Sequence, residues 1–296
     1  MDSESLATFV AIHRAGGVSA AAERLHRSQP AISRRLALLE ARLGAPLFER
    51  TASGLSLSQA GAALLPHAER ALAALEDAAA AMADFAAGTA GPISLAVVGT
   101  LADARLSAVL RGFAEEAPGV PVHLRTATSA EVSRHVRAGE AALGLRYFRD
   151  RGPGLDQRPL APEPLALVCA PDHPLAGREL AALDRLADAR WLAFPHRAGR
   201  PEAATHIAPL FAARGIEAPE VTPVDSLSGQ RALAAAGHGL ALLPEGFAAE
   251  DLARGALGRI RVRGFAPANP VTLLTRSGGY LGPAARRLAD LLAARF

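Results

Sequence analysis

Arginine side chains gather around one short stretch of the chain, "RLHRSQPAISRRLALLEARLG", which covers residues 24–44. The chain contains no lysine, and its formal net charge is only +3. Guanidinium groups bind phosphate, and they can also donate two parallel hydrogen bonds to the edge of guanine. A local cluster of arginine in a chain of nearly balanced charge therefore predicts a nucleic-acid contact at this stretch.

The same stretch has the apolar spacing of a helix. Four of its apolar residues fall in one stripe and predict a buried side: Ile32, Leu36, Leu39 and Leu43. The opposite side and one edge carry the residues that we expect to face DNA bases: Gln29, Pro30, Ser33 and Arg34. Glutamine can pair with adenine, arginine with guanine, and proline can touch the methyl group of thymine.

A second set of residues is better placed for the phosphate backbone: Arg24, Arg27, Ser28, Arg35 and Arg50. Contacts of this kind give affinity and register but carry no sequence information. The alternative is that these arginines form only the solvated face of an ordinary helical bundle. The order of the elements around them favours the first interpretation.

Short helices are predicted before this stretch and within it. A first helix is expected to end at Gly16-Gly17, a second to be capped by Ser19, and a third to begin after Ser28 and stop at Gly44. Within residues 45–58, the runs around 47–48 and 55–57 alternate apolar and polar positions, and residues 52–54 supply a turn, so a small hairpin is predicted. Two helices joined by a tight break, then a hairpin, form the layout of a winged helix-turn-helix.

Residues 59–88 are rich in alanine, leucine and glutamate, with apolar positions every three or four residues. This pattern predicts a long helix whose apolar seam pairs with a second copy of the chain. The alternative is a helix that packs on the surface of the domain that follows. Residues 86–92, "AAGTAGP", are then expected to form a short hinge.

The rest of the chain alternates strand-like and helical runs. Strand-like runs include "ISLAVVGT", "AALGLRY", "PLALVCAP" and "VTLLTR", and helical runs cover residues 105–117, 131–138 and 229–236. This alternation predicts an α/β fold with parallel sheets. Proline-rich breaks near residues 159–164 and 267–270 permit a division into two lobes, with a ligand site between them or at strand ends.

Several classes of protein are disfavoured by the sequence. The acidic start "MDSES" does not suit a signal peptide, no run of about 18 apolar residues suits a membrane span, and Cys169 has no second cysteine to pair with. We therefore expect a cytoplasmic protein with no membrane contact. Without lysine there is no phosphate-binding P-loop, and the histidines lack the spacing of metal ligands. We expect no enzyme, no cofactor and no metal.

Residues 1 to about 88 resemble the N-terminal module of the LysR-type transcriptional regulators. The most specific parts are "AAERLHRSQPAISRRLALLEARLGAPLFER" and "LSLSQAG", and a looser match continues through "DHPLAG" and "AGHGLALLP". The resemblance implies an N-terminal all-α winged helix-turn-helix, a long linker helix that dimerises, and a two-lobed effector domain like a periplasmic binding protein. One departure is "TASGL" after Arg50, where members often have more basic residues in the wing.

The resemblance divides the chain as follows: a DNA-binding domain over residues 1–58, a linker helix over 59–88 and an effector-binding domain over 89–296. Within the last, lobe I would cover about 91–161 and 267–296, and lobe II about 162–266. The implied partners are double-stranded promoter DNA, a small-molecule effector, further copies of the chain in a homodimer or homotetramer, and RNA polymerase. The alternative is a solute-binding or enzymatic α/β protein whose N-terminal helices only dimerise it.

Effector-binding residues follow from the same resemblance, by position at strand ends. From lobe I they are Thr100, Thr128, Ser129 and Arg146; from lobe II they are Phe194, His196, Asp225 and Ser226. Hydroxyl groups and helix-start N–H groups suit a carboxylate or another small polar acceptor. Arg146 would add a charge-assisted hydrogen bond. The alternatives are that the threonines merely cap helices and that Arg146 pairs with an acid on the surface.

Overall fold

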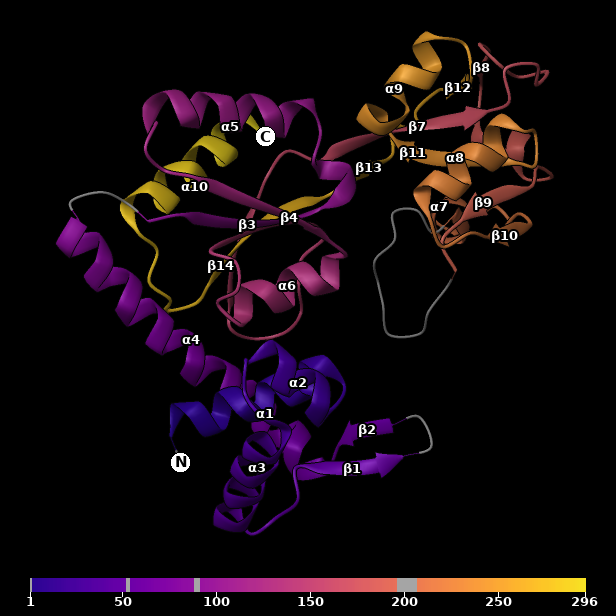
Figure 1. The fold of residues 1–296 in the computed structure, drawn as a ribbon. Helices are drawn as coiled ribbons and strands as arrows, with labels where there is room; N and C mark the ends of the chain where they lie inside the picture. Colours follow the sequence, from indigo (N-terminus) through magenta and orange to yellow (C-terminus); the bar gives the residue numbers. More distant parts are fainter. Residues whose placement is uncertain (1, 52–53, 88–90, 196–206) are drawn as a thin grey trace.

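A computed structural model of the 296-residue chain describes all residues except 1, 52–53, 88–90 and 196–206. Figure 1 shows a small N-terminal module, one long helix that leaves it, and two α/β lobes beyond. The module contains helices α1 (Ser3–Ala15), α2 (Val18–Arg24) and α3 (Gln29–Leu43). A two-stranded antiparallel sheet follows, formed by β1 (Phe48–Thr51) and β2 (Gly54–Leu57).

Local signals in the sequence set the ends of these helices. Asp2 caps α1 by accepting a hydrogen bond from Ser5 N at 2.8 Å, and Gly16 ends α1 with a left-handed backbone. The predicted cap of α2 is wrong, because Gly17 holds that position and Ser19 lies inside the helix. Gly44 ends α3 with φ 71°, as its place after the apolar stripe predicts.

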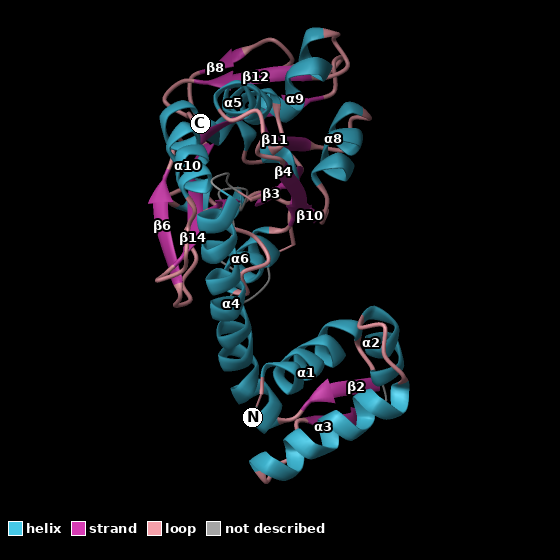
Figure 2. Ribbon diagram, turned by 60° about the vertical axis from the view of Figure 1, so that its left-hand side comes forward, coloured by secondary structure: helices cyan, strands magenta, loops and turns pink. Residues whose placement is uncertain are grey.

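Helix α4 (Gln59–Ala87) begins inside the module and continues beyond it, as Figure 2 shows. Its first turns pack on the module core around Phe9 and Leu47, through Leu64 and the buried Ala68. A Cβ on Gly61 would lie 2.1 Å from the carbonyl oxygen of Leu47, so only glycine permits this close approach. This close approach fixes the start of α4 relative to the start of the hairpin.

Lobe I is built on a five-stranded sheet in the order β4-β3-β5-β14-β6. Its strands are β3 (Ile93–Val98), β4 (Val122–Ala127), β5 (Leu143–Tyr147), β6 (Leu155–Pro159) and β14 (Val271–Arg276). Helices α5 (Ala104–Glu116) and α10 (Pro283–Arg295) pack on one face, and α6 (Ser129–Arg137) packs on the other. The short 3₁₀ helix η1 (Gly99–Leu101) joins β3 to the loop before α5.

Lobe II is built on a seven-stranded sheet, β10-β9-β11-β7-β12-β8 with β13 beside β7. The bounds are β7 (Glu163–Cys169), β8 (Glu179–Leu180), β9 (Trp191–Ala193), β10 (Val221–Pro223), β11 (Leu240–Pro244), β12 (Gly258–Val262) and β13 (Ala268–Asn269). Its helical segments are η2 (Leu183–Leu186), α7 (Ile207–Ala212), α8 (Leu227–Ala235) and α9 (Glu245–Ala253). Trp191 and Phe211 meet edge to face in its core.

The chain crosses between the lobes twice, once from β6 to β7 and once from β13 to β14. This return path corrects the expectation of parallel sheets. Strand β14 runs antiparallel to both β5 and β6, and β7 runs antiparallel to β11, β12 and β13, so both sheets are mixed. A strand that enters a sheet directly from the other lobe needs no helical crossover and is free to run antiparallel.

Two further expectations bear on the class of protein. Within the described ranges, every helix is too short or too polar to cross a membrane. Cys169 is fully buried in the core of lobe II, where burial raises the pKa of its thiol to about 11. It is the small core residue that the apolar sequence around it predicts.

Candidate functional site

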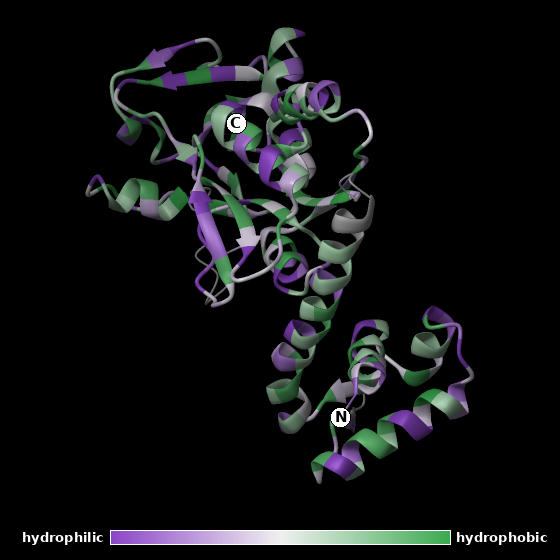
Figure 3. Cartoon of the chain, turned by 90° about the vertical axis from the view of Figure 1, so that its left-hand side faces the viewer, coloured by the Kyte–Doolittle hydropathy of each residue, from purple (hydrophilic) through white to green (hydrophobic). Residues whose placement is uncertain are grey.

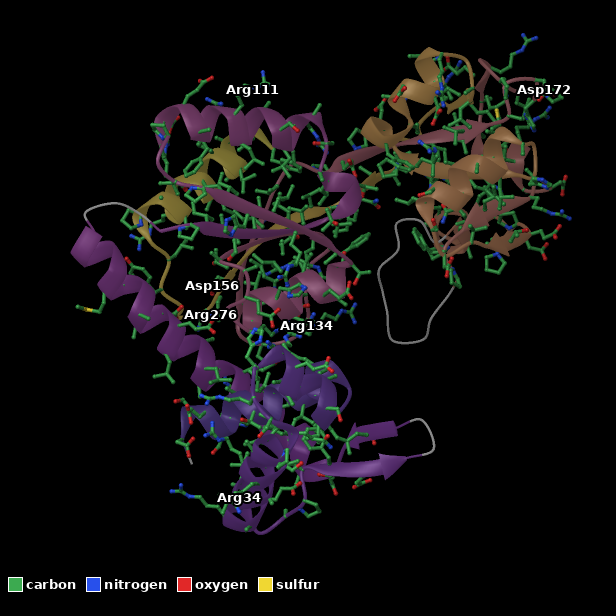
Figure 4. All side chains as sticks on the ribbon, viewed as in Figure 1. Arg34, Arg111, Arg134, Asp156, Asp172 and Arg276 are labelled. Carbon is green, nitrogen blue, oxygen red and sulfur yellow. The ribbon has the colours of Figure 1, made fainter. Side chains whose placement is uncertain are left out.

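The N-terminal turns of α3 form an exposed polar surface. Gln29, Pro30, Ser33 and Arg34 are all exposed, while Ile32 and Leu39 on the other side pack against α1 and α2. Figure 4 shows Arg34 extending away from the molecule. The residues expected to face bases thus share one open face of a helix whose back is fixed in a core.

The residues expected to contact phosphate lie around this face. Arg24 and Arg27 are exposed, and Ser28 stands at the N-cap of α3 without making a capping hydrogen bond. Arg35 is half-buried, and its Nη1 lies 2.6 Å from Glu4 Oε2 on α1, so part of its charge is already neutralised. Arg50 belongs to β1, but its side chain lies outside the described part of the chain.

The buried stripe predicted for α3 is only partly correct. Leu36 is half-buried and Leu43 is exposed, while Leu38, outside the predicted stripe, is 65% exposed. The reason is that α3 extends past the helices that support its first turns, as Figure 2 shows. Figure 3 shows hydrophilic and hydrophobic turns alternating along this helix. The last turns of α3 therefore have fewer neighbours to pack against.

A cavity of about 850 Å³ is lined by residues of both lobes. From lobe I, Thr100 comes from η1, and Thr128 and Ser129 come from the start of α6. Thr128 caps α6 in a capping box with Glu131, so the alternative proposed for this threonine holds for its hydroxyl group. Thr100 does not cap a helix; its Oγ1 lies 2.7 Å from the hydroxyl oxygen of Tyr147.

From lobe II, the predicted residues Phe194, Asp225 and Ser226 line the same cavity. Ser226 caps α8, because its Oγ accepts a hydrogen bond from Gly229 N at 3.2 Å. Helices α6 and α8 therefore both begin at the cavity, and their first N–H groups carry partial positive charge there. His196 lies outside the described residues.

The expectation for Arg146 is not met. This side chain does not line the cavity; its Nη1 donates to Ser133 Oγ at 2.5 Å and to Asp150 Oδ2 at 2.7 Å. Successive residues of a strand point to opposite faces, so Arg146 faces α6 while Tyr147, one residue later, faces the cavity. Although burial opposes ionisation, hydrogen bonds from Ser133 and Gly152 and the charge of Arg146 lower the pKa of Asp150.

Tyr147 lines the cavity and belongs to a chain of hydrogen bonds that runs from Thr100 through Glu163 to Arg105. Its hydroxyl group donates to Glu163 Oε2, and Arg105 Nη2 donates to Glu163 Oε1 at 3.0 Å. Burial raises the pKa of Glu163, although the hydrogen bond from Tyr147 and the charge of Arg105 act against that rise. Burial and the neighbouring carboxylate likewise raise the pKa of Tyr147. These groups hold one another in place.

Sequence reasoning missed several residues that line the cavity: Val98, Gly99, Thr126, Ala127, Glu131, Tyr147, Phe148, Pro195, Leu227, Ser228, Pro244, Phe247 and Asn269. Several of the missed residues end strands themselves: Val98, Ala127, Tyr147, Pro244 and Asn269 are the last residues of β3, β4, β5, β11 and β13. Position at a strand end does not by itself decide which of the neighbouring residues faces the cavity. Glu131 and Asp225 are the charged groups among the described lining residues, where no arginine or histidine appears.

The far end of α6 contacts the N-terminal module and α4. Arg14 on α1 pairs with Glu140, just after α6, and its Nη2 lies 3.0 Å from Glu69 Oε1 on α4. Glu140 also pairs with His135 on α6. Beside these ion pairs, Ala73 of α4 is fully buried, and a Cβ added to Gly139 would lie 2.9 Å from the Ala73 Cβ. Figure 1 shows α6 on the side of lobe I that faces the module.

Comparison with known proteins relates both halves of the chain to one family. Residues 3–62 match the model described as "Bacterial regulatory helix-turn-helix protein, lysR family", and residues 86–296 match "LysR substrate binding domain". The HTH-type transcriptional regulator TfdS of Cupriavidus pinatubonensis is 33% identical over 250 residues, which are 84% of each chain. The HTH-type transcriptional regulator TcbR of Pseudomonas sp. strain P51 is 34% identical over 252 residues, again 84% of each.

Two solved structures are similar over the whole length. A crystal structure of CbnR, a LysR family transcriptional regulator, has a TM-score of 0.71 and 30% identity, and covers 100% of this chain and 99% of that one. Full-length CbnR complexed with its target DNA has a TM-score of 0.69 and 30% identity, with 100% of both chains covered.

Proposed function

The chain belongs to the family of LysR-type transcriptional regulators, and from this membership we propose how its two sites work together. It is a DNA-binding transcriptional regulator with an effector-binding domain, and not an enzyme. We assign DNA binding to residues 1–58, dimerisation to 59–88 and ligand binding to 89–296. We propose that the protein acts in the cytoplasm, where it has access to promoter DNA. We also propose RNA polymerase as a further partner on the DNA.

The observation that carries the DNA-binding proposal is the exposed N-terminal face of α3. Gln29, Ser33 and Arg34 project from a helix whose opposite side is anchored in a core, so they can enter a major groove as a rigid unit. Arg24 and Arg27 flank this face and would bind phosphate. The partly neutralised Arg35 would add a weaker phosphate contact.

Two variants separate base reading from phosphate binding. Arg34→Ala should lose the preference for specific over random duplex, by about 1–3 kcal/mol at one base pair. Arg35→Ala should weaken binding to both duplexes equally and reduce the dependence of affinity on salt concentration. Titration against duplexes from upstream regions, at several salt concentrations, measures both effects. Equal losses on specific and random DNA for Arg34→Ala would contradict base reading by this side chain.

We propose that α4 pairs with its copy in a second chain. Leu75 and Met82 are 56% and 64% exposed on this helix, a large apolar surface to leave in water. A two-fold dimer would read two half-sites about 34–36 Å apart, or a multiple of that distance. Two dimers would make the tetramer that the family resemblance implies. Sedimentation of Leu75→Glu against wild type tests the pairing, and an unchanged oligomeric state would contradict it.

For the effector, we propose a small molecule with a polar acceptor such as a carboxylate, bound between the lobes. The first N–H groups of α6 and α8 supply donors, and Ser228 adds a hydroxyl group. Thr100 also lines the cavity, but its proton goes to Tyr147, because the Tyr147 hydroxyl group donates to Glu163. The cavity volume of about 850 Å³ is in the range of small-molecule sites. A thermal-shift screen with aromatic acids tests this, because a ligand of the folded state raises apparent stability.

We propose that α6 carries the signal to the DNA-binding module. Its first residues line the cavity, and Glu140 beyond its last turn pairs with Arg14. A ligand that shifts α6 would change this pairing, and its effect is limited to its differential affinity for the two arrangements. Glu140→Gln should therefore leave ligand affinity unchanged but reduce the effect of ligand on DNA affinity. Undiminished coupling in this variant would contradict the route through α6.

A further inference from the structure

Two sequence motifs that neither proposed site uses, "DHPLAG" and "AGHGLALLP", meet at a second cavity, which lies within lobe II. Its lining comes from three segments: the turn after β7, the residues just before β9, and the link from α8 to β11. We call it the lobe II cavity. Its volume is about 310 Å³, against roughly 30 Å³ for one water molecule in the liquid. It is therefore large enough for a small polyatomic ligand.

The lobe II cavity lies at the far end of β7 from the crossover between the lobes. Strand β7 begins at Glu163 in that crossover and ends at Cys169, and the turn that follows it lines the cavity. At about 3.3 Å per residue, the two ends of this seven-residue strand are about 20 Å apart. Figure 4 shows Asp172, from the same turn, at the outer end of lobe II. A ligand here would be separate from an effector bound between the lobes.

Close contacts of the main chain hold the three lining segments together. Leu240 N donates a hydrogen bond to the carbonyl oxygen of Arg190 at 2.8 Å, and a Cβ on Gly239 would lie 2.8 Å from that same oxygen. Gly237 has φ 80°, and a Cβ there would lie 3.9 Å from the Ala170 Cβ. Gly239 thus permits the close approach to β9, and Gly237 permits the left-handed turn before it. The main chain therefore fixes how the lining segments lie relative to one another.

The imidazole ring of His173 is oriented by its own turn. Its Nδ1 accepts a hydrogen bond from Leu175 N at 3.2 Å, so the neutral ring carries its proton on Nε2. Nε2 is then a hydrogen-bond donor and not a metal ligand, because a metal needs the lone pair of an unprotonated ring nitrogen. This tautomer indicates that the cavity binds a hydrogen-bond acceptor.

Arg190 and His238 line the cavity and add further donors. Both are exposed, and the His238 side chain makes no hydrogen bond with any residue that the structure describes. Within the same part of the chain, the Arg190 side chain has Glu220 as its partner, with Oε1 3.2 Å from Nη2 in an exposed pair. Most of the guanidinium N–H groups are therefore left for a ligand. The main-chain N–H groups of Arg190 and Gly239 also donate to no described residue.

The charges around the lobe II cavity favour an anion. Arg190 supplies a permanent positive charge, and no carboxylate group is among the described residues that line the cavity. Asp172 precedes His173 in the turn but does not belong to the lining. A carboxylate ligand offers two acceptor oxygens, whereas a tetrahedral oxyanion offers up to four. Donors that come from three separate segments therefore match the tetrahedral oxyanion better.

We propose that the lobe II cavity binds a tetrahedral oxyanion, a phosphate or sulfate group, with Arg190 as its charged partner and the imidazole rings of His173 and His238 as further donors. This site goes beyond the proposed function, because neither DNA binding nor the effector between the lobes involves it. The bound anion would join the turn after β7 to the residues before β9 and to the link before β11.

Calorimetric titration of the full-length protein tests the site, with phosphate, sulfate, glycerol 1-phosphate and acetate at constant ionic strength. We expect a tetrahedral anion to bind wild type about tenfold more tightly than acetate does. Arg190→Gln and His238→Ala should each weaken that binding by about tenfold, since each removes a hydrogen bond to a charged group. Arg111→Gln and His123→Ala, at exposed residues of lobe I, are the matched controls and should bind as wild type does. Comparison of phosphate with glycerol 1-phosphate distinguishes a free from an esterified ligand.

Glu220→Gln should change the affinity in the opposite direction. It removes the carboxylate that competes for Arg190, so the tetrahedral anion should bind more tightly, by up to about fivefold. Glu217→Gln removes the same charge at another exposed residue, which has no ion pair with any described residue, and it should have a smaller effect. Equal effects of the two variants would show that only the overall charge matters and would count against the contact through Arg190.

Three results would overturn the assignment. They are the absence of binding by all three tetrahedral anions, binding that is unchanged in both Arg190→Gln and His238→Ala, and acetate that binds as tightly as phosphate and sulfate. Because the altered side chains are exposed, thermal unfolding of each variant without the anion should resemble that of wild type. If Arg190→Gln or His238→Ala unfolds at a lower temperature, the gain in Glu220→Gln decides, since that variant loses only an exposed contact.

Discussion

Among the single residues that line the cavity between the lobes, Tyr147 connects lobe I to the first crossover. Its hydroxyl group joins Thr100 of lobe I to Glu163 at the first residue of β7. Its ring packs in the core of lobe I. One side chain thus links the core of one lobe to the first crossover between the two.

Tyr147→Phe should lower the free energy of unfolding by about 1–3 kcal/mol at neutral pH, since buried Glu163 loses a donor. The pKa of Glu163 is already raised by burial, and losing this bond raises it further. A raised carboxyl pKa favours the folded state most below its unfolded value of 4.5, and this advantage is lost as pH rises through the folded value. The loss caused by Tyr147→Phe should therefore shrink in acid.

Chemical denaturation across a pH series measures this effect. Tyr280, the other tyrosine of the chain, is 39% exposed, and Tyr280→Phe is the control. A loss for Tyr147→Phe that grows as pH falls would contradict the link to Glu163.

Glu4 offers a second prediction at the residue scale. Its carboxylate lies 2.6 Å from Arg35 Nη1; the Glu4 side chain is exposed, and the Arg35 side chain is half-buried. Glu4→Gln should free Arg35, tighten binding to specific and random duplexes alike, and steepen the salt dependence by up to about one counterion. Titration at several salt concentrations checks this; tighter binding to only the specific duplex would contradict a phosphate role for Arg35.

Sequence position finds a residue but not the direction of its side chain. The family resemblance, read by position at strand ends, predicted a set of residues that all lie on the lining of the cavity between the lobes: Thr100, Thr128, Ser129, Phe194, Asp225 and Ser226. Arg146 fails because the alternation of side chains along β5 turns it toward Asp150. Which residues of a strand face the core depends on the register of that strand in the sheet. The apolar residues on both sides of position 146 do not reveal this register.

At the scale of elements, the turn after α6 decides how closely α4 approaches lobe I. Gly139 has φ 74°, and a Cβ there would lie 2.9 Å from Ala73 Cβ on α4. Gly139→Ala should therefore lower the free energy of unfolding by about 1–3 kcal/mol beyond the backbone strain itself. Gly177→Ala isolates that strain, because Gly177 has φ 73° and nothing within 4 Å of the added atom. Equal losses in the two variants would contradict close packing at Gly139.

Element boundaries were predictable where capping chemistry is local. Gly16 and Gly44 end α1 and α3 as expected, since a left-handed residue after an apolar stripe favours glycine. The start of α2 was not predictable from Ser19, because the N-cap residue is Gly17 and the serine lies inside the helix. The prediction of parallel strands was wrong for β14 and β7, because the direction of a strand depends on the path of the chain between the lobes and not on local residues.

At the scale of the whole molecule, the pairing of Arg14 with Glu140 holds the module against lobe I. Burial opposes ionisation of Glu140, but the hydrogen bond with His135 and the charge of Arg14 outweigh it and lower the pKa of Glu140. A lowered pKa stabilises the fold above the unfolded value of 4.5, and this contribution is lost as pH falls through the folded value below it. The order of domains was predictable from sequence, but this contact between them was not.

Glu140→Gln should cost about 1 kcal/mol of unfolding free energy at neutral pH, a modest figure because water still reaches the pair. The difference between wild type and variant should shrink as pH falls below 4.5. Denaturant titration at a series of pH values measures it. Glu220→Gln, at an exposed ion pair with Arg190, is the control. A difference independent of pH would show that the charge of Glu140 is not what holds the module.

The double crossing of the chain also sets the order in which the molecule can be made on the ribosome. Strand β14 lies between β5 and β6, so the sheet of lobe I has a gap until residues 271–276 are synthesised. Lobe II is complete before that point, apart from the edge it shares with the crossover. The lobe whose synthesis begins first is thus the last to be completed, and until then β5 and β6 lack the partner strand that joins them. We expect the nascent chain to need chaperones most during that interval.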